Sequence, residues 1–495
     1  MSKYNIANKK FPYEQDMERI ESYEHNERLY RGKHFDAFNM KVNDVRFSKK
    51  YEQLKYVVCN FASLLSKVCA DFLFSEKPKF IADKGDQFFL DELVEFNELH
   101  LQNYESAVHS SIFGDCIYKI RIGKKNTEDI EESVLIEEIS PKIYYPHLDL
   151  QNVRKRPEVT ELAWLIEKKN ERNEVEKFLR REIHEPGYIL NELWMMEGNK
   201  VLQQVDLKTL LETENLPEVQ ETMTDFNWIW HVPNTRLASG FFGESDYNDI
   251  ETLLYSLNNR VSKIDNILDK HSDPILALPE GVLDEHGEVA RGSFHMFEKP
   301  QGTNEKPEYI VWNAELTSAF SQIDKLVEFL FLFSEVSPDV VGMGKGQSDS
   351  GRALKLRMLR TLAKVQRKRL YYDLILKDML FKAQEISLAH GVGVNGVKLS
   401  KPPAEVSIDW QDGLPDDEQE MILIEQMRLD AGLSTTADAL MRLDGLSPDK
   451  AEQKAKELEE GTRLTLLENN LTQLRQKVED TEDEDGEHSS QQQET

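Results

Sequence analysis

The chain has 495 residues, 39% of them hydrophobic and 31% charged, and its 61 basic against 90 acidic residues give a net charge of −29. A chain of this length and hydrophobic content exceeds the usual size of a single core, so we expect two or more substructures. Because non-specific phosphate binding needs clustered Lys and Arg, the acidic balance excludes a general nucleic-acid-binding surface and a reader of DNA sequence.

Cysteines, the N-terminal segment and the apolar runs exclude further classes. Cys59, Cys69 and Cys116 form no C-x-x-C and have no histidine pair nearby, so we interpret them as reduced, buried thiols of a cytoplasmic chain rather than a zinc site. The polar stretch from Met1 to Lys10 predicts no signal peptide. The densest apolar run, Leu326 to Phe333, is far shorter than the roughly 18 residues of a membrane span, so none is expected.

Helices are expected first. Apolar residues recur at helical spacing in four segments, and Gly32 and Gly114 follow two of them as residues that accept a left-handed helix end. The predicted helices cover Glu14 to Arg31, Leu54 to Phe74, Gln87 to Glu98 and Asn103 to Phe113.

From Cys116 to Val232 the hydrophobic period changes to two, which predicts an antiparallel β meander. Its tryptophans are interpreted as core aromatics rather than a binding platform: Trp164, Trp194, Trp228 and Trp230. The expected strands are Cys116 to Ile122, Val134 to Ile139, Val159 to Ile166, Phe178 to Ile183, Ile189 to Met196 and Phe226 to Val232.

The middle of the chain predicts a helical hairpin. One helix is expected from Asp246 to Lys270, a strand-like excursion punctuated by Pro and Gly from Asp273 to Trp312, and a returning helix from Ala314 to Phe333. Two helices joined in this way cannot bury their apolar faces alone, so they must pack on neighbours or on other copies of the chain.

A loop rich in Gly, Ser and Asp follows, from Ser337 to Gly351. A P-loop would leave a strand and end in Gly-Lys-Ser/Thr, whereas here Lys345 is followed by Gly346 and a helix precedes the loop. A nucleotide site is therefore disfavoured, and a mobile loop or an ordinary solvent loop stays open. The candidate residues are Val341, Gly342, Met343, Gly344, Lys345, Gly346, Gln347 and Ser348.

A strongly basic helix is expected from Arg352 to about His390, with no acid between Arg352 and Tyr372. In an acidic chain such segregation calls for neutralising partners, which are either DNA phosphates or acidic surfaces of other copies. We favour the second, because the positive charges point to several sides of the helix. The candidates are Arg352, Lys355, Arg357, Arg360 and Lys364.

The C-terminal part predicts a hinge-like turn at Gly391 to Gly396, a short strand from Val406 to Trp410 and a helix from Asp416 to Ala431 ended by Gly432. Ser434 and Ser447-Pro448 are start signals for two further helices. Val478 to Thr495 has almost no apolar residues and is expected to be disordered.

Several short motifs occur in a recognisable order. They are Glu27 to Gly32, Gly114 to Tyr118, His231 to Asn234, Ser245-Asp246, His271 to Leu276 and Ser350 to Lys355. Their order over roughly residues 14 to 445 resembles the portal proteins of tailed bacteriophages, particularly those of phages that infect Gram-positive hosts. No single motif is specific, and the order carries the resemblance.

The resemblance implies an α+β portal architecture. It would divide the chain into a wing at 1–243, a first stem helix at 244–272, a clip at 273–312, a second stem helix at 313–336, a tunnel loop at 337–351, the long basic helix of the wing at 352–390, a return strand at 391–415, a helical crown at 416–477 and an acidic tail at 478–495.

The same resemblance implies roles for the candidate residues. The loop at 337–351 would project into a central channel, and the basic helix would cross the interface between subunits. The clip would face the packaging motor and later the connector proteins through a set of acidic and aromatic residues: Glu280, Asp284, Glu285, Phe294 and Phe297.

The implied function is a ring of about twelve copies at a unique capsid vertex of the virion, with no cofactor and no enzymatic activity of its own. Double-stranded viral DNA would pass through it non-specifically, which suits a like-charged wall. The implied partners are the terminase large subunit, head-completion or adaptor proteins, scaffold and major capsid protein, with no membrane. The alternatives are a nucleotide-dependent enzyme using Gly342 to Gly346, and a head-morphogenesis protein that forms no channel.

Overall fold

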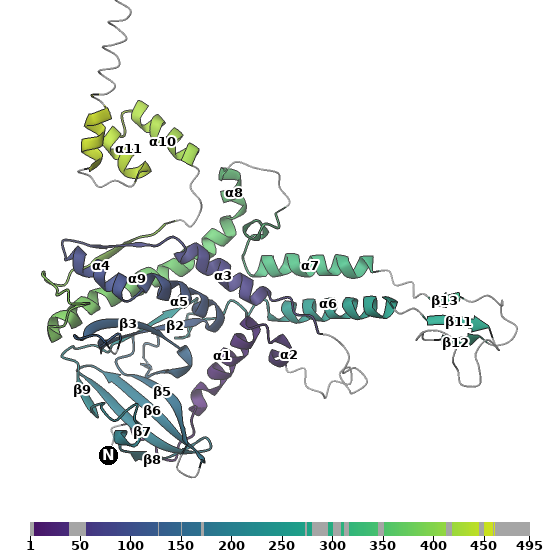
Figure 1. Ribbon diagram of the computed structural model, residues 1–495, viewed down its shortest axis with the longest axis horizontal. Coiled ribbons are helices and arrows are strands. Elements are labelled where there is room, and N and C mark those ends of the chain that lie inside the picture. The colour runs from purple at the N-terminus through teal and green to yellow at the C-terminus, as the bar shows by residue number, and fades with distance from the viewer. Residues whose placement is uncertain are drawn as a thin grey trace, which may run out of the picture. The chain divides into compact units, whose positions relative to one another are not determined.

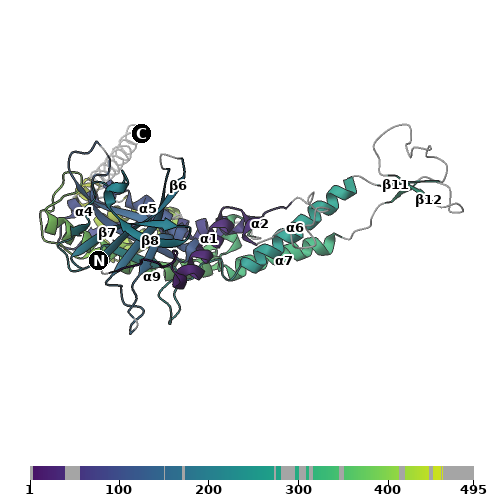
Figure 2. The same ribbon diagram turned by 90° about the horizontal axis from the view of Figure 1, so that it is seen from below.

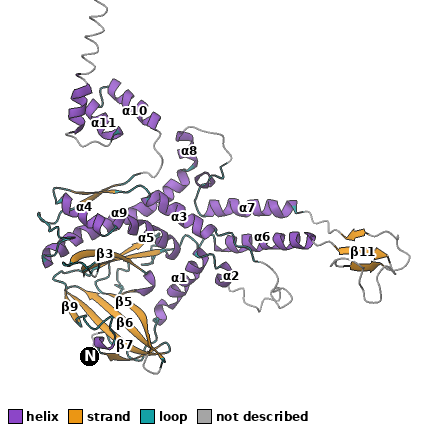
Figure 3. Cartoon of the chain, in the orientation of Figure 1, coloured by secondary structure: helices purple, strands orange, loops and turns teal. Residues whose placement is uncertain are grey.

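The structure is a computed structural model that describes residues 4–38, 56–126, 128–149, 151–169, 173–272, 275–279, 296–299, 308–310, 316–344, 351–411, 418–444, 450–458 and 460. The chain divides into two compact units, Met1–Gly413 and Leu414–Thr495. Helices and mainly antiparallel sheets alternate along the first unit, and the described part of the second is helical (Figures 1 and 3). The fold is therefore mixed α+β, as predicted.

The N-terminal helices confirm most of the predicted segments. They are α1 (Met17–Tyr30), the short α2 (His34–Ala37), α3 (Phe61–Phe74), α4 (Gln87–Phe96) and α5 (Leu99–Phe113). Gly32 and Gly114 both have positive φ at the helix ends where they were expected. A polar residue caps α4, since the Asp86 side chain accepts a hydrogen bond from the Phe89 amide.

The start of α3 was predicted wrongly, because residues 56–60 are not helical. In this stretch the Val57 amide donates to Ser262 Oγ at 2.9 Å, and the Cys59 amide donates to Asn258 Oδ1 at 2.9 Å. Side chains of a helix that is distant in sequence thus accept hydrogen bonds from backbone amides of the segment that was expected to be helical. Local periodicity could not reveal that competition.

The β region folds as two sheets instead of the single predicted meander. One has the antiparallel order β10 (Ile229–Pro233), β2 (Asp115–Gly123), β3 (Ser133–Ile139). After β3, the 3₁₀ turn Pro141–Ile143 connects this sheet to the first strand of the second sheet. The other runs in the order β4 (Tyr144–Pro146), β5 (Thr160–Lys169), β6 (Val175–Glu185), β7 (Tyr188–Glu197), β8 (Lys200–Val205), with β9 (Val219–Glu221) pairing β7.

The cores of these sheets contain the alternating apolar residues that indicated strands. Leu179 and Trp194 pack with Ile6 and Phe11 of the N-terminal segment, which also bonds to β8 through the Asn8 amide and Val201 carbonyl. Trp194, Trp228 and Trp230 are buried, while Trp164 is partly buried. The interpretation of these tryptophans as core residues is confirmed for the three buried ones.

The helical hairpin is present. Helix α6 (Glu251–Ser272) and helix α7 (Thr317–Phe333) contact each other and lie side by side in Figures 1 and 2. Between them in sequence, β11 (Ile275–Pro279), β12 (Met296–Lys299) and β13 (Glu308–Ile310) form a small sheet in which β11 pairs parallel with β12 and antiparallel with β13. The strand-like excursion is thereby confirmed.

The predicted basic helix is broken once. Helix α8 (Gly351–Arg357) ends at a turn at Met358, and helix α9 (Leu359–His390) continues for 32 residues. After the left-handed Gly391, the strand β14 (Val406–Asp409) pairs antiparallel with β1 (Lys79–Ala82). The predicted short strand therefore returns to the N-terminal part of the chain.

The second unit contains α10 (Glu418–Asp430), α11 (Thr436–Leu443) and a helical stretch at 450–458. Gly432 has the expected positive φ. The cap of α11 is Thr435 rather than the predicted Ser434, because Thr435 forms a reciprocal capping box with Asp438. Ser447-Pro448 and Val478 to Thr495 lie outside the described residues.

Two searches of the described residues complete the fold. None of the helices described here has the length and apolar character needed to cross a membrane. Within the same residues, His, Cys, Asp and Glu side chains nowhere gather in a group of three or more that could hold a metal ion. All three cysteines are free thiols, with Cys69 and Cys116 buried and Cys59 partly buried.

Candidate functional site

The first half of the predicted loop is a tight turn at the end of α7. Val341 ends the 3₁₀ turn Pro338–Val341, Gly342 has φ +74°, and Met343 is exposed. A Cβ on Gly344 would collide with the Asp339 carboxylate. The turn follows a helix, whereas a P-loop follows a strand, so this turn does not have the backbone arrangement of a P-loop. Lys345, Gly346, Gln347 and Ser348 lie outside the described residues.

Of the predicted clip residues, the structure places one. Phe297 belongs to the strand β12, whose backbone pairs with β11 through Ala277. The other four lie outside the described residues: Glu280, Asp284, Glu285 and Phe294.

Three arginines of the basic helix pair with acids of their own chain. Arg360 donates to Glu335 at 2.6 Å, Arg367 forms an ion pair with the same carboxylate, and Arg357 lies 3.5 Å from Asp339. Both acids belong to the turn that follows α7. The side chain of Arg352 lies outside the described part, and Lys355 lies exposed on α8.

Two buried lysines of α9 meet one carboxylate at the base of α6. Lys368 donates to Asp246 Oδ2 at 2.6 Å, and Lys364 Nζ lies 3.1 Å from Asp246 Oδ1. Asp246 also accepts hydrogen bonds from Ser111 Oγ at 2.6 Å and Asn234 Nδ2 at 3.0 Å. The carboxylate therefore joins α5, the segment after β10, the turn before α6 and helix α9.

The electrostatics of this cluster favour its ionised form. Burial opposes ionisation of Asp246, but the charges of Lys364 and Lys368 and the hydrogen bonds from Lys368 and Ser111 outweigh it and hold the pKa of the carboxyl well below its usual range. Burial likewise opposes the charge of Lys364, and Asp246 outweighs it, so the pKa of this lysine is raised. Asp246 and Lys364 therefore stabilise each other's charged forms.

The Asp115 carboxylate is fully buried and has its own set of partners. Asp115 accepts from Tyr23 Oη at 2.5 Å, is 2.5 Å from His231 Nε2, and accepts from the Gly243 amide at 2.8 Å. Gly114 and Gly243 approach so closely that a Cβ on Gly243 would collide with the Gly114 carbonyl oxygen. Burial is the main cause that raises the pKa of the Tyr23 hydroxyl.

Motifs that are scattered in sequence thus meet at one place. Gly114-Asp115, His231 to Asn234 and Ser245-Asp246 form a single junction where the hairpin leaves the sheets. Sequence reasoning missed Asp246 and Glu335 as partners of the basic helix. The available signal was the excess of acids within the chain itself, which makes an internal counter-charge the nearest choice.

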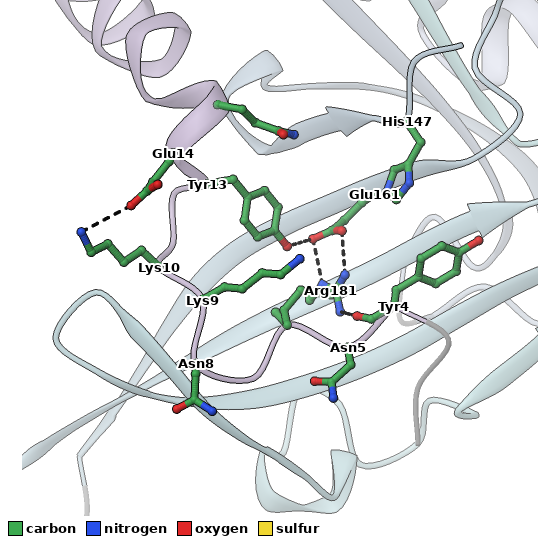
Figure 4. A pocket seen from close by; sticks show the side chains of 12 residues that line it. Tyr4, Asn5, Asn8, Lys9, Lys10, Tyr13, Glu14, His147, Glu161 and Arg181 are labelled. Carbon is green, nitrogen blue, oxygen red and sulfur yellow. Dashed lines mark hydrogen bonds and ion pairs between the residues drawn. The ribbon is translucent and has the colours of Figure 1, made fainter. Parts of the chain in front are cut away.

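A polar pocket of about 800 Å³ lies under the N-terminal segment (Figure 4). At its base Arg181 donates to both oxygens of Glu161, and Tyr13 donates to the same carboxylate. Burial is the largest cause that raises the pKa of Tyr13, and the Glu161 charge adds to it. Because Arg181 and Tyr13 both donate to Glu161, we interpret these groups as structural contacts that hold the N-terminal segment against the sheet.

The chain matches the family described as "Phage portal protein, SPP1 Gp6-like" over residues 9–463. This range contains all the helices and strands of the residues that the structure describes. Among curated proteins, none matches the chain.

Proposed function

Since the chain belongs to the SPP1 Gp6-like family of phage portal proteins, we propose that three of its parts surround the portal channel. They are the helical hairpin of α6 and α7, the small sheet β11–β13 and the loop between α7 and α8. A phage portal protein forms the channel for DNA packaging and ejection at a capsid vertex, so the chain is a structural component of the virion and not an enzyme. The observation that carries this conclusion is a match spanning nearly the whole chain.

The division of labour is a proposal built on the order of the elements. We assign the N-terminal helices and the two larger sheets, up to residue 243, to a wing, α6 and α7 to a stem, and the small sheet β11–β13 to a clip. We assign α9 and β14 to the part of the chain that returns to the wing, residues 416–477 to a helical crown and residues 478–495 to an acidic tail. Support comes from the contacts of Asp246 and Asp115, which join the segment before the stem to the β10-β2-β3 sheet and to α9.

The loop after α7 is proposed to face DNA in the channel. Its described part, residues 337–344, contains one acid, Asp339, which lies 3.5 Å from Arg357, and the sequence continues with Lys345 through Ser348. Small residues there would let the loop follow a polymer that is out of register with the ring. The acidic balance of the chain as a whole would keep DNA from binding tightly to the channel wall.

The partners beyond the ring are proposals too. A clip carrying Glu280, Asp284, Glu285, Phe294 and Phe297 would receive the terminase large subunit during packaging and head-completion or adaptor proteins afterwards. Scaffold and major capsid protein would contact the outer parts. Helices α8 and α9 would lie at the contact between neighbouring copies, although Arg357, Arg360 and Lys364 already have acidic partners in their own chain.

The decisive experiment is a mass measurement of the purified protein combined with end-on electron-microscope images. We expect a closed ring of about twelve copies around a central hole. A compact single-copy particle under all solution conditions tried would contradict the assignment. Assays of ATP binding and hydrolysis on the same material address the alternative nucleotide-dependent enzyme, and we expect both to show no activity.

A further inference from the structure

Three polar side chains of β6 lie in the interface between the two larger sheets. Because side chains alternate along a strand, Arg180, Glu182 and His184 project from the same face of β6. That face lies against β2 of the other sheet, since the Lys119 ammonium group donates to Glu182 Oε2 at 2.5 Å. Apolar residues of the two sheets pack together in one core cluster. The polar group is therefore enclosed between sheets and does not lie on an outer surface.

His184 is buried in this interface without a hydrogen bond. The residue is 1% exposed, and neither ring nitrogen has a hydrogen-bond partner among the residues that the structure describes. The Nε2 atom lies 3.5 Å from Glu182 Oε2. Across the strand pairs its neighbours are Thr160 of β5 and Ile189 of β7, and neither of them carries a charge. A proton added to this ring would create a buried charge, which is costly unless it is paired.

The carboxylate beside the ring already has two cationic partners. Glu182 lies 2.5 Å from the Lys119 ammonium group and 3.3 Å from the Arg180 guanidinium group. Arg180 is 1% exposed and also donates to Asn191 Oδ1 at 2.6 Å. Burial opposes ionisation of Glu182, but the charge of Lys119 and the other neighbours outweigh it and hold the pKa of the carboxyl below its usual value. A proton on His184 would place a third positive charge around this one carboxylate.

The same surroundings keep the His184 ring neutral. Burial is the largest cause that lowers the pKa of this histidine, and the charges of Lys119 and Arg180 lower it further. Glu182 raises the pKa but does not outweigh burial. In the unfolded chain, where water surrounds the ring, the pKa is about 6.5. Below that pH the unfolded chain therefore binds a proton that the folded chain excludes.

We propose that His184 is an acid-sensitive switch between the two sheets, because its protonation sets three positive charges around Glu182 and loosens the contact of β6 with β2. The pKa of the ring is lower in the folded state than in the unfolded chain. The stability contributed by the neutral ring is thus present above about pH 6.5 and is lost as the pH falls further. The switch lies in the sheets and not in the parts assigned to the channel, so it does not depend on the proposed function.

Urea unfolding of the full-length protein, followed by fluorescence at several pH values, tests the switch. His184→Gln keeps a polar side chain at this position but cannot gain a charge. Between about pH 7 and pH 5.5 the unfolding equilibrium constant of the wild type should rise about threefold or more relative to that of the variant. A ratio that stays constant over this range would overturn the proposal.

His109 is the matched control, because its surroundings have the opposite effect. Its Nδ1 atom lies 2.8 Å from Glu138 Oε1, and its side chain is 43% exposed. Burial opposes the charge of this ring, but the hydrogen bond and the charge of Glu138 outweigh it, so the pKa of His109 is raised. Acidification should therefore lower the unfolding constant of the wild type relative to that of His109→Gln. The same direction for both variants would contradict the role given to His184.

A direct titration covers the case in which His184→Gln does not fold. Exchange of the ring C2 proton for deuterium, followed by mass spectrometry, measures the pKa of each histidine in the wild-type protein. We expect the midpoint of His184 below about 6.5 and that of His109 above it. At about pH 5, amide hydrogen exchange relative to the intrinsic rate should increase more in β2 and β6 than in α9. A His184 midpoint at or above about 6.5, or exchange in β2 and β6 that does not increase, would overturn the switch.

Discussion

The Lys368 ammonium group donates a 2.6 Å hydrogen bond to the Asp246 carboxylate across 122 positions of the sequence. Lys364 reaches the other oxygen of the same carboxylate at 3.1 Å. One buried acid therefore holds the long helix α9 against the base of the hairpin. The cost of removing that acid measures how firmly the two are joined.

Replacing Asp246 with Asn should lower the free energy of unfolding by about 3–5 kcal/mol, because two buried lysines lose their counter-charge while remaining desolvated. Urea unfolding followed by fluorescence measures this change. Asp249→Asn is the matched control, since Asp249 is exposed in the same turn and should change stability by less than about 0.5 kcal/mol. Equal effects of both substitutions would contradict the role given to Asp246.

The stability contributed by Asp246 should depend on pH in a defined direction. Its pKa is lowered in the folded state, so its contribution is fully present above the ordinary carboxyl value of 3.8 and is lost as the pH falls toward the lower folded value. The difference in unfolding free energy between wild type and Asp246→Asn should be constant from about pH 7 to pH 4 and shrink below. A difference that grows on acidification would refute this account.

Glu335 offers a contrasting ion pair near the surface. Its partners Arg360 and Arg367 are 71% and 46% exposed, so Glu335→Gln should cost only about 0.5–1 kcal/mol. Added salt should remove most of that difference, because exposed charges are screened. Thermal unfolding of both proteins at low and high salt measures it. A salt-independent loss of several kcal/mol would mean that Glu335 is buried in the working assembly.

The contact between Gly114 and Gly243 should tolerate no side chain. A Cβ on Gly243 would collide with the Gly114 carbonyl oxygen and lie 2.8 Å from the Asn234 nitrogen, so both backbones would have to move. Gly243→Ala should destabilise the protein by about 3 kcal/mol. Gly240→Ala is the control, because a Cβ at that position would lie 3.6 Å from the Phe242 carbonyl oxygen, an ordinary contact distance. Thermal unfolding would be expected to separate the two variants clearly.

Much of the secondary structure could be predicted because its causes are local. The spacing of Ile250, Leu254 and Leu257 indicated α6, and all three are buried, with Ile250 directly before the first residue of the helix. Period-two alternation located most strands, and glycines located helix ends. The prediction was wrong where distant groups intervene, as at residues 56–60, where side chains of α6 bind the backbone amides.

The candidate site was predicted less completely. The run of basic residues indicated the basic helix, but its acidic partners were expected outside the chain. Asp246 and Glu335 of the same chain form ion pairs with it instead. Nothing in the spacing of Asp115, His231 and Asp246 indicates that they meet. Only the return of β10 to β2 and the packing of α9 bring them together.

By itself the sequence established the mixed α+β class, the helix pair around a strand-like excursion, and the portal resemblance that the family match confirms. Hydrophobic periodicity and motif order are properties of the linear sequence, so they can be recognised before the fold is known. The tertiary structure alone decided which acids neutralise the basic helix. Those outcomes depend on distances between residues far apart in the chain, and electrostatic and apolar contacts act only over such short distances in space.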